Sequence, residues 1–167
     1  QTHYTMWLAN TSSTSNTIEM DVMFSVDSPV EGVKLSGLSA GINYNTSIVN
    51  GGTLTLSYVG GKTPIIANLV NSSLNAATAG HLRIGATPLV IGSAIDIPAG
   101  TYCLGRYRVT NTASWSSASN AQLWLQPVNT GGKTLCAVNS WISGATSGTS
   151  SSYTVANSGL TLNYTQA

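Results

Sequence analysis

The clearest pattern in the chain is an alternation of apolar and polar residues over residues 17–26. One side of this segment carries Ile18, Met20, Val22, Phe24 and Val26, and the other carries Glu19, Asp21, Met23 and Ser25. A period of two is typical of a β-strand that buries one face and exposes the other. The segment therefore predicts a half-buried strand.

The same alternation, or a short apolar run, recurs along the rest of the chain. Further strands are predicted over residues 2–8, 53–59, 82–84, 89–91, 104–109, 122–125, 135–138 and 160–164. Clusters of Gly, Asn, Ser and Pro separate these segments. Residues 71–79 are weakly helix-like, and the Gly/Ser/Thr-rich residues 143–152 are predicted to form a surface loop. Many short alternating strands predict one all-β domain over residues 1–167, an antiparallel β-sandwich.

Three segments carry a resemblance to a known family. They read LSAGINYN at 38–45 with IVNGG at 48–52, GHLRI at 80–84, and Gly100 followed by LGRYRVT at 104–110. Together they resemble the cohesin-like β-sandwich modules of secreted bacterial surface proteins, over roughly residues 17–126. The resemblance implies a jelly roll of about nine strands. It also implies a binding or structural role, since cohesins bind dockerins and related sandwiches bind carbohydrate or build surface layers.

Charge is scarce in this chain. Only 7% of the 167 residues are charged and the net charge is +1, whereas charged residues make up about 25% of an average soluble domain. The six scattered basic residues form no patch, so nucleic acid is not an expected partner. A surface with so little net charge has weak repulsion between copies, which favours association.

The two cysteines and the chain ends predict a secreted protein. The chain starts at Gln1, as a mature chain does after removal of a signal peptide, and it has no apolar run long enough to insert into a membrane. In an oxidising compartment Cys103 and Cys136 are predicted to form a disulfide, worth roughly 3–4 kcal/mol for a loop of about 33 residues. The alternative is two free buried thiols.

The residues that carry chemistry in enzymes are few and poorly placed. Residues 37–41 match G-x-S-x-G but lack the strand–turn–helix context of a nucleophile elbow. Glu19 and Asp21 are expected on a solvated strand face, and a calcium site at Asp27 and Glu31 would need several further oxygens. His3 and His81 are expected to be ordinary surface or strand residues. The sequence therefore predicts no catalytic site, metal or cofactor.

Aromatic residues and glycosylation sequons are the candidate contacts with sugars. Trp115 lies in a polar stretch and is predicted either to stack on a sugar or to anchor a loop. Trp124 is expected in the core or on the opposite sheet face, and Arg83, Arg106 and Arg108 are possible contributors to a polar groove. The sequons predict possible glycan attachment at Asn10, Asn45, Asn71 and Asn163.

A lone sandwich without catalytic residues must act through its surface, and two functions follow. In the first, the chain is a subunit of an extracellular fibre or surface layer that grows by terminal-strand addition between copies. The candidate donor strands contribute Tyr4, Met6, Trp7 and Leu8, followed by a polar hinge over 10–16, and Leu160, Leu162 and Tyr164. Both strands can instead pair within their own sandwich. In the second function, the chain is a carbohydrate-binding or cohesin-like adhesion module.

Overall fold

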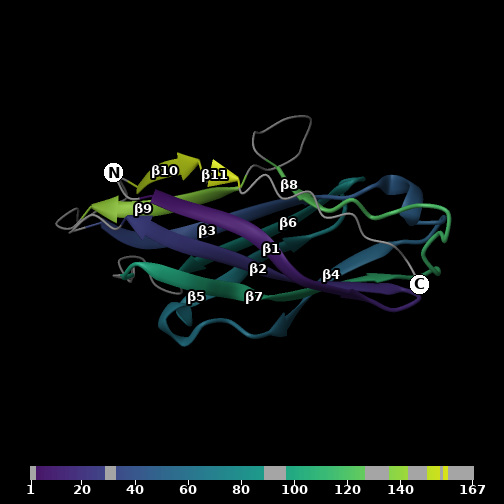
Figure 1. Ribbon diagram of the computed structural model, residues 1–167, viewed down its shortest axis with the longest axis horizontal. Helices are drawn as coiled ribbons and strands as arrows, with labels where there is room; N and C mark the ends of the chain where they lie inside the picture. Colours follow the sequence, from purple (N-terminus) through teal and green to yellow (C-terminus); the bar gives the residue numbers. More distant parts are fainter. Residues whose placement is uncertain are drawn as a thin grey trace.

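Eleven β-strands arranged in two sheets make up the described part of the chain (Figure 1). The computed structural model describes residues 3–28, 33–88, 97–126, 136–142, 150–154 and 156–157. The strands are β1 (His3–Ser13), β2 (Thr17–Ser28), β3 (Val33–Asn43), β4 (Leu54–Gly60), β5 (Leu69–Asn75), β6 (His81–Pro88), β7 (Gly100–Asn111), β8 (Trp124–Leu125), β9 (Ala137–Ile142), β10 (Ser150–Thr154) and β11 (Ala156–Asn157). Two short 3-10 helices, η1 (Thr46–Ile48) and η2 (Pro64–Ile66), flank β4.

The strands form two sheets that pack face to face, which confirms the predicted sandwich. The first sheet has the order β11-β1-β2-β7-β4, and the second has the order β10-β9-β3-β6-β5, with β8 added beside β3. Neighbouring strands are antiparallel, except that β11 runs parallel to β1. The described part of the chain contains no helix with the length and apolar character needed to cross a bilayer.

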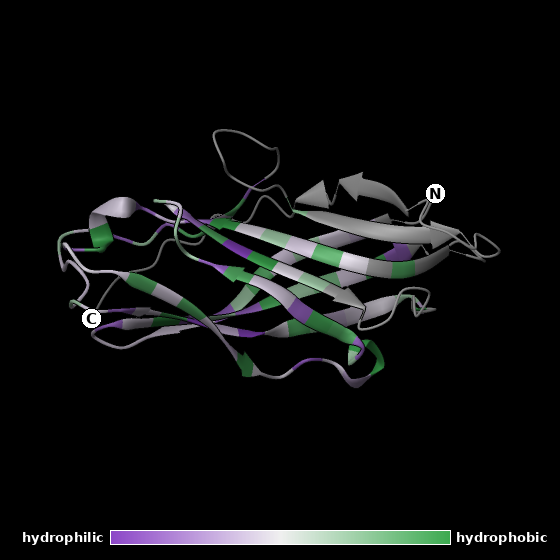
Figure 2. Cartoon of the chain, turned by 180° about the vertical axis from the view of Figure 1, so that it is seen from behind, coloured by the Kyte–Doolittle hydropathy of each residue, from purple (hydrophilic) through white to green (hydrophobic). Residues whose placement is uncertain are grey.

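The core lies between the sheets and is built from alternate residues of each strand. On β2, Met20, Val22 and Phe24 are completely buried, as the alternation predicted. The ring of Phe24 stacks on Tyr102 of β7 with centroids 5.5 Å apart. The facing sheet contributes a matching set, namely Leu38, Ala40, Ile42, Leu82, Ile84 and Ala86. Hydrophobic positions alternate with paler or hydrophilic ones along the described strands in Figure 2.

The N-terminal strand pairs within its own sandwich. β1 is antiparallel to β2, with Met6 opposite Phe24 and Leu8 opposite Val22. It extends to Ser13, so most of the predicted hinge over residues 10–16 is strand, and the hinge prediction is wrong. The register shifts between Ala9 and Ser12, where Asn10 takes a positive φ of 51°. This irregularity absorbs the extra residues without breaking the pairing.

Two local predictions are wrong because pairing between strands outweighs a weak local preference. The helix-like residues 71–79 contain most of β5, which lies beside β6 with Leu74 opposite Ile84. Of the predicted loop 143–152, residues 150–152 belong to β10, which pairs with β9, and residues 143–149 lie outside the described residues. The predicted strands 89–91 and 160–164 lie outside the described residues, so Leu160, Leu162 and Tyr164 cannot be placed.

The predicted disulfide is also wrong, because Cys103 and Cys136 are free thiols. Cys103 lies between the buried Tyr102 and Leu104 on β7, so strand alternation directs it to the outer face of the first sheet. Cys136 is buried beside the second sheet, where its Sγ accepts a hydrogen bond from the Gly41 N–H and donates to the Gly41 carbonyl, at 3.3 and 3.4 Å. A bridge would have to pass through the core.

We predict that both thiols remain reduced and react slowly in the native protein. Burial raises the pKa of Cys103, and burial raises the pKa of Cys136 to about 11, so the reactive thiolate is scarce at about pH 8. Ellman's reagent should react slowly with the folded chain and should detect both thiols once guanidinium unfolds it. In the Cys103→Ser variant, the reagent should detect one thiol after unfolding. Finding no thiols after unfolding without reductant would reinstate the disulfide.

Candidate binding face

The outer side of the second sheet is the candidate site, and we call it the β3–β6–β5 face. On β3 and β6 its members alternate with the core residues of the same strand, so they lie on the side away from the core, where Gly41 is nevertheless buried. They are Ser39 and Gly41 on β3, Arg83 and Gly85 on β6, Ser73 and Asn75 on β5, and Trp124 on β8. Apart from Arg83, Asn75 and Trp124, these residues are small, and the face is correspondingly low in relief.

Strand register brings the members into two parallel rows. Ser39 lies opposite Gly85, which lies opposite Ser73, and in the next row Gly41 lies opposite Arg83, which lies opposite Asn75. A Cβ atom on Gly85 would lie 3.3 Å from the Cβ of Ser73, which is a tight contact. Glycine therefore lets β5 and β6 pack closely and keeps the face flat at this point.

Arg83 is the cation of the β3–β6–β5 face. Its side chain is exposed, and within the described residues its guanidinium makes no hydrogen bond or ion pair. An exposed guanidinium keeps its five N–H donors available for a planar acceptor such as a carboxylate. The side chain is thus placed for contact with another molecule.

Trp124 provides an exposed aromatic surface at one end of the same face. It lies on β8, opposite Asn43 of β3, and 38% of its surface is exposed. Its neighbour Leu125 points inward and is buried, so Trp124 points outward. Of the two positions expected from the sequence, the core is therefore excluded and the outer sheet face is correct.

A chain of buried polar side chains underlies this end of the face. The Asn43 amide donates from Nδ2 to Oε1 of Gln126 at 2.5 Å, and its Oδ1 lies 2.9 Å from Nδ1 of His81. All three residues are at most 3% exposed. The sequence predicted that His81 is either a surface residue or an ordinary strand residue. It lies on a strand and is buried in this network, so the surface position is excluded. Because buried polar groups are costly to leave unpaired, this chain fixes β3, β6 and β8 relative to one another.

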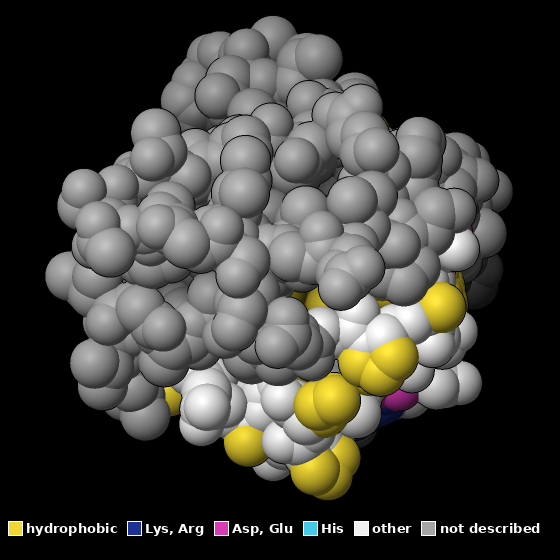
Figure 3. Space-filling model, turned by 90° about the vertical axis from the view of Figure 1, so that its left-hand side faces the viewer, with side chains coloured by type: hydrophobic (Ala, Val, Ile, Leu, Met, Phe, Trp, Pro, Cys, Tyr) yellow, Lys and Arg dark blue, Asp and Glu magenta, His cyan; other side chains and the backbone are white. Residues whose placement is uncertain are grey.

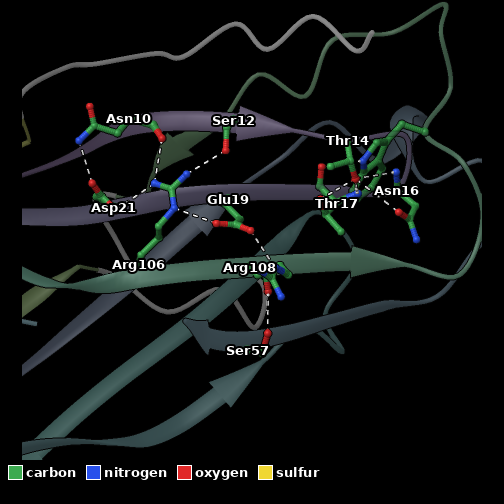
Figure 4. Close-up of polar contacts among 11 residues, drawn as sticks. Asn10, Ser12, Thr14, Asn16, Thr17, Glu19, Asp21, Ser57, Arg106 and Arg108 are labelled. Carbon is green, nitrogen blue, oxygen red and sulfur yellow. Dashed lines mark hydrogen bonds and ion pairs between the residues drawn. The ribbon is translucent and has the colours of Figure 1, made fainter. Parts of the chain in front are cut away.

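On the outer face of the first sheet, in contrast to Arg83, the arginines are held in ion pairs (Figure 4). Arg106 lies opposite Asp21 and Arg108 lies opposite Glu19. Arg106 contacts Glu19 Oε1 through Nε at 2.8 Å and Asp21 Oδ1 through Nη1 at 3.0 Å, and Arg108 contacts Glu19 Oε2 through Nε at 2.8 Å. Arg106 also donates to the carbonyl of Asn10 and the hydroxyl of Ser12.

This network uses up most of the charge on that face. Hydrogen bonds from Arg108 and Arg106 lower the pKa of Glu19 below its ordinary value of 4.5. The expectation that Glu19 and Asp21 lie on an outer strand face is correct, but both are engaged in ion pairs. Arg106 and Arg108 are likewise occupied with partners of their own chain. Arg83, on the second sheet, makes no such ion pair within the described part of the chain.

The structure separates the other predicted site residues. Tyr4, Met6 and Leu8 point into the core with at most 3% of their surface exposed, whereas Trp7 points to the outer face of the first sheet, where it is half-buried opposite Met23. Trp115 is only 5% exposed, and its Nε1–H donates to the Thr17 carbonyl at 3.2 Å. Trp115 therefore anchors a loop, and its predicted role as a sugar-stacking platform is wrong.

The sequon asparagines take part in local hydrogen bonds. Asn10 donates from Nδ2 to Asp21, and Asn45 donates from Nδ2 to the Asn120 carbonyl while its Oδ1 caps η1. Asn71 accepts a hydrogen bond from the Tyr107 hydroxyl at 2.8 Å. Glycan attachment stays a prediction for these three, and Asn163 lies outside the described residues.

The sequence reasoning missed most of the β3–β6–β5 face. Only Arg83 and Trp124 were singled out, one as a possible groove residue and the other as a core or sheet-face residue. The available signal was the alternation in LSAGI at 38–42 and LRIGA at 82–86, where every second residue is small or is Arg83. It shows which residues share a face, but only strand pairing shows that the two segments lie side by side.

We predict that the network at Glu19 stabilises the fold above, but not below, the ordinary carboxyl range. Because the folded pKa is lowered, its contribution is present above pH 4.5 and is lost as pH falls through the folded value. In urea unfolding, Glu19→Gln should cost roughly 1 kcal/mol or less at about pH 7, since the pairs are partly exposed. The deficit should shrink towards about pH 3. A deficit independent of pH would contradict the ion-pair assignment, and Glu19→Gln combined with Arg108→Gln serves as the double-mutant control.

Comparison with known proteins gives matches only among solved structures. No protein-family model and no curated protein matches the sequence. The seventh ScaB type I cohesin from Pseudobacteroides cellulosolvens aligns with a TM-score of 0.55 and 12% identity, over 99% of this chain and 92% of that chain. The sixth cohesin from scaffoldin B of Acetivibrio cellulolyticus, solved in complex with a Cel5 dockerin mutant, aligns with a TM-score of 0.53 and 13% identity, over 96% and 95%.

A third structure extends the same likeness. CaCohA2 from Clostridium acetobutylicum aligns with a TM-score of 0.53 and 17% identity, over 92% of this chain and 90% of that chain. Identities this low leave the fold as the shared property. The matches span nearly the whole chain and agree with the two-sheet topology described above. This chain therefore has the fold of cohesin modules.

Proposed function

We propose that this chain is a non-enzymatic binding module that recognises a protein partner through the β3–β6–β5 face. The cohesin fold supports this proposal, because one of the similar structures is a cohesin in complex with a dockerin. The partner class proposed here is accordingly a small dockerin-like protein module, and the two proteins would form a non-catalytic assembly.

The observation that carries the proposal is Arg83, which is exposed among small residues and makes no ion pair within the described part of the chain. Small ligands generally need a concave pocket, whereas a low surface of Ser and Gly side chains admits the close approach of another protein. Arginine and tryptophan are enriched among the residues that dominate protein interfaces. Arg83 would pair with a carboxylate of the partner, and Trp124 would cover apolar surface at the end of the contact.

We further propose that the module acts outside the cell. Its low charge and its abundance of Ser, Thr and Asn are unlike a typical cytosolic enzyme, and one of the matched modules belongs to a scaffoldin by its description. No step of the proposed function needs a cofactor, since recognition uses only side chains on the face.

The two other functions considered from the sequence have less support. Fibre growth through the N-terminal strand would require β1 to leave its own sheet, and this would expose Tyr4, Met6 and Leu8, which are buried. Carbohydrate binding through Trp115 would require an exposed ring, and that ring is buried. Filaments of the secreted protein in electron micrographs would favour the fibre function over the binding function.

We predict that Arg83→Ala weakens binding to the native partner by about tenfold or more, because a charge-assisted hydrogen bond is lost. The partner would be captured on the immobilised chain from proteins secreted by the source organism and identified by mass spectrometry. Affinity would then be measured by calorimetry with the purified partner. Trp124→Ala should weaken the same interaction.

Arg108→Ala is the matched control. It removes an equally charged, exposed arginine from a strand of the opposite sheet, so partner affinity should stay within about twofold of the wild type. A partner that binds Arg83→Ala and Trp124→Ala as tightly as the wild type would refute the assigned face. Binding to glycans alone, with no protein captured, would favour the carbohydrate-binding function instead.

A further inference from the structure

An open groove of about 670 Å³ runs along one side of the sandwich, between β4 of the first sheet and β5 of the second. Its apolar lining comes from β4, from β5 and the residue after it, and from the two sides of η1, namely Tyr44, Val49, Leu54, Leu56, Leu74 and Ala76. Uncharged polar residues complete it, namely Thr46, Thr53, Thr55 and Asn75. None of the described residues that line the groove is charged. The groove is therefore a place where the core is incompletely covered at the edge of the fold.

The backbone of β4 offers unused hydrogen bonds beside this groove. Among the described residues, β4 pairs with β7 alone, so its other edge is open. Thr53 accepts from the Thr112 N–H at 3.1 Å, which shows that Thr53 points towards β7. Because the direction of the backbone groups alternates along an antiparallel strand, the N–H and C=O groups of Leu54 and Leu56 point to the open edge.

The first part of the β4 edge, residues 54–58, lacks the features that protect exposed strand edges. Such edges usually carry lysine, proline or a bulge that prevents pairing with another chain. Residues 54–58 read LTLSY, without charge or proline, and their register with β7 is unbroken. The register shifts only between Tyr58 and Gly60, and Lys62 lies over the Tyr58 ring at that end. At the end of β4 and in η2, the side chains of Tyr58, Val59 and Ile65 are 39–45% exposed. Figure 3 shows hydrophobic side chains grouped on the lower part of the described surface at one end of the molecule.

We propose that a second copy of this chain covers the groove, through antiparallel pairing of β4 with β4 of the second copy. The two copies would be related by a two-fold axis perpendicular to the sheets, which makes the neighbouring strands antiparallel and keeps each face on its own side. Leu54 and Leu56 of both copies would then lie next to one another, and the two grooves would close against each other.

A second copy fits this edge better than a charged partner does. The paired segments, residues 54–58 of each copy, carry no charge, so no like charges face each other along the two strands. The net charge of +1 adds almost no long-range repulsion between copies. The N-terminal strand of the second copy is not the occupant, because its apolar residues are already buried in their own core.

This inference is independent of the proposed function and uses a different surface. Two-fold symmetry about that axis would place both β3–β6–β5 faces on the same side of the dimer. The pair would present two binding faces in one plane, which raises the avidity for a partner that carries repeated modules. Loss of partner binding on Arg83→Ala would leave the dimer intact, so the two proposals can fail separately.

The test is the mass of the whole chain in solution, measured by sedimentation velocity over a range of concentrations. The wild type should form dimers in a concentration-dependent equilibrium that salt barely affects, because the paired strand segments carry no charge. Thr55→Lys adds a positive charge on the outer face of β4 and should raise the dimer dissociation constant by about tenfold or more.

Thr101→Lys is the matched control, since Thr101 is an exposed threonine on β7, which is not an edge strand. It should dimerise like the wild type, and unchanged melting curves would show that both variants fold. Amide exchange adds a residue-level readout, with the N–H groups of Leu54 and Leu56 becoming protected as concentration rises. A wild type that stays monomeric up to about 1 mM, a dimer that Thr55→Lys leaves intact, or no added protection at these amides would overturn the proposal.

Discussion

The structure depends on the alternation of side chains along β2, because β2 lies at the centre of the first sheet. It pairs with β1 on one side and β7 on the other, so its inward residues determine where both neighbours place theirs. Met20, Val22 and Phe24 are completely buried. A shift of one residue in register would exchange these side chains for Glu19, Asp21 and Met23 and bring charge into the core. The second sheet packs against the apolar surface that results.

With so few charges, their placement distinguishes the two faces of the sandwich. On the first sheet, Glu19 and Asp21 hold Arg106 and Arg108 in ion pairs between β2 and β7, and that face has little charge left for a partner. On the second sheet, Arg83 lies in a surface of small side chains and makes no such pair among the described residues. The same side-chain type therefore stabilises one face and leaves the other available for recognition.

The edge strands of the two sheets leave part of the core open to solvent. A sandwich buries its core between two layers, but its sides are covered only where a strand, helix or loop lies across the seam. At β4 and β5 the seam is an open groove. An uncharged edge strand beside an apolar groove favours association, and the low net charge does not oppose it. The low charge of the whole chain thus matters most at β4 and the groove beside it.

The sequence by itself determined which residues face inward, because alternation along a strand follows from local backbone geometry alone. The core positions of β1, β2 and β6 follow from it, and so does the sandwich, whereas Tyr58 of β4 is exposed and a register shift moves the inward positions of β7. Tertiary structure decided what depends on neighbours distant in the chain. It placed Cys103 on the outer face of the first sheet and Cys136 beside the second sheet, buried Trp115 while exposing Trp124, and drew residues 69–75 into β5 by pairing with β6. It also gave Arg106 two carboxylates, whereas Arg83 pairs with none among the described residues. Strand register, which no single segment encodes, sets the partner of each of these charges.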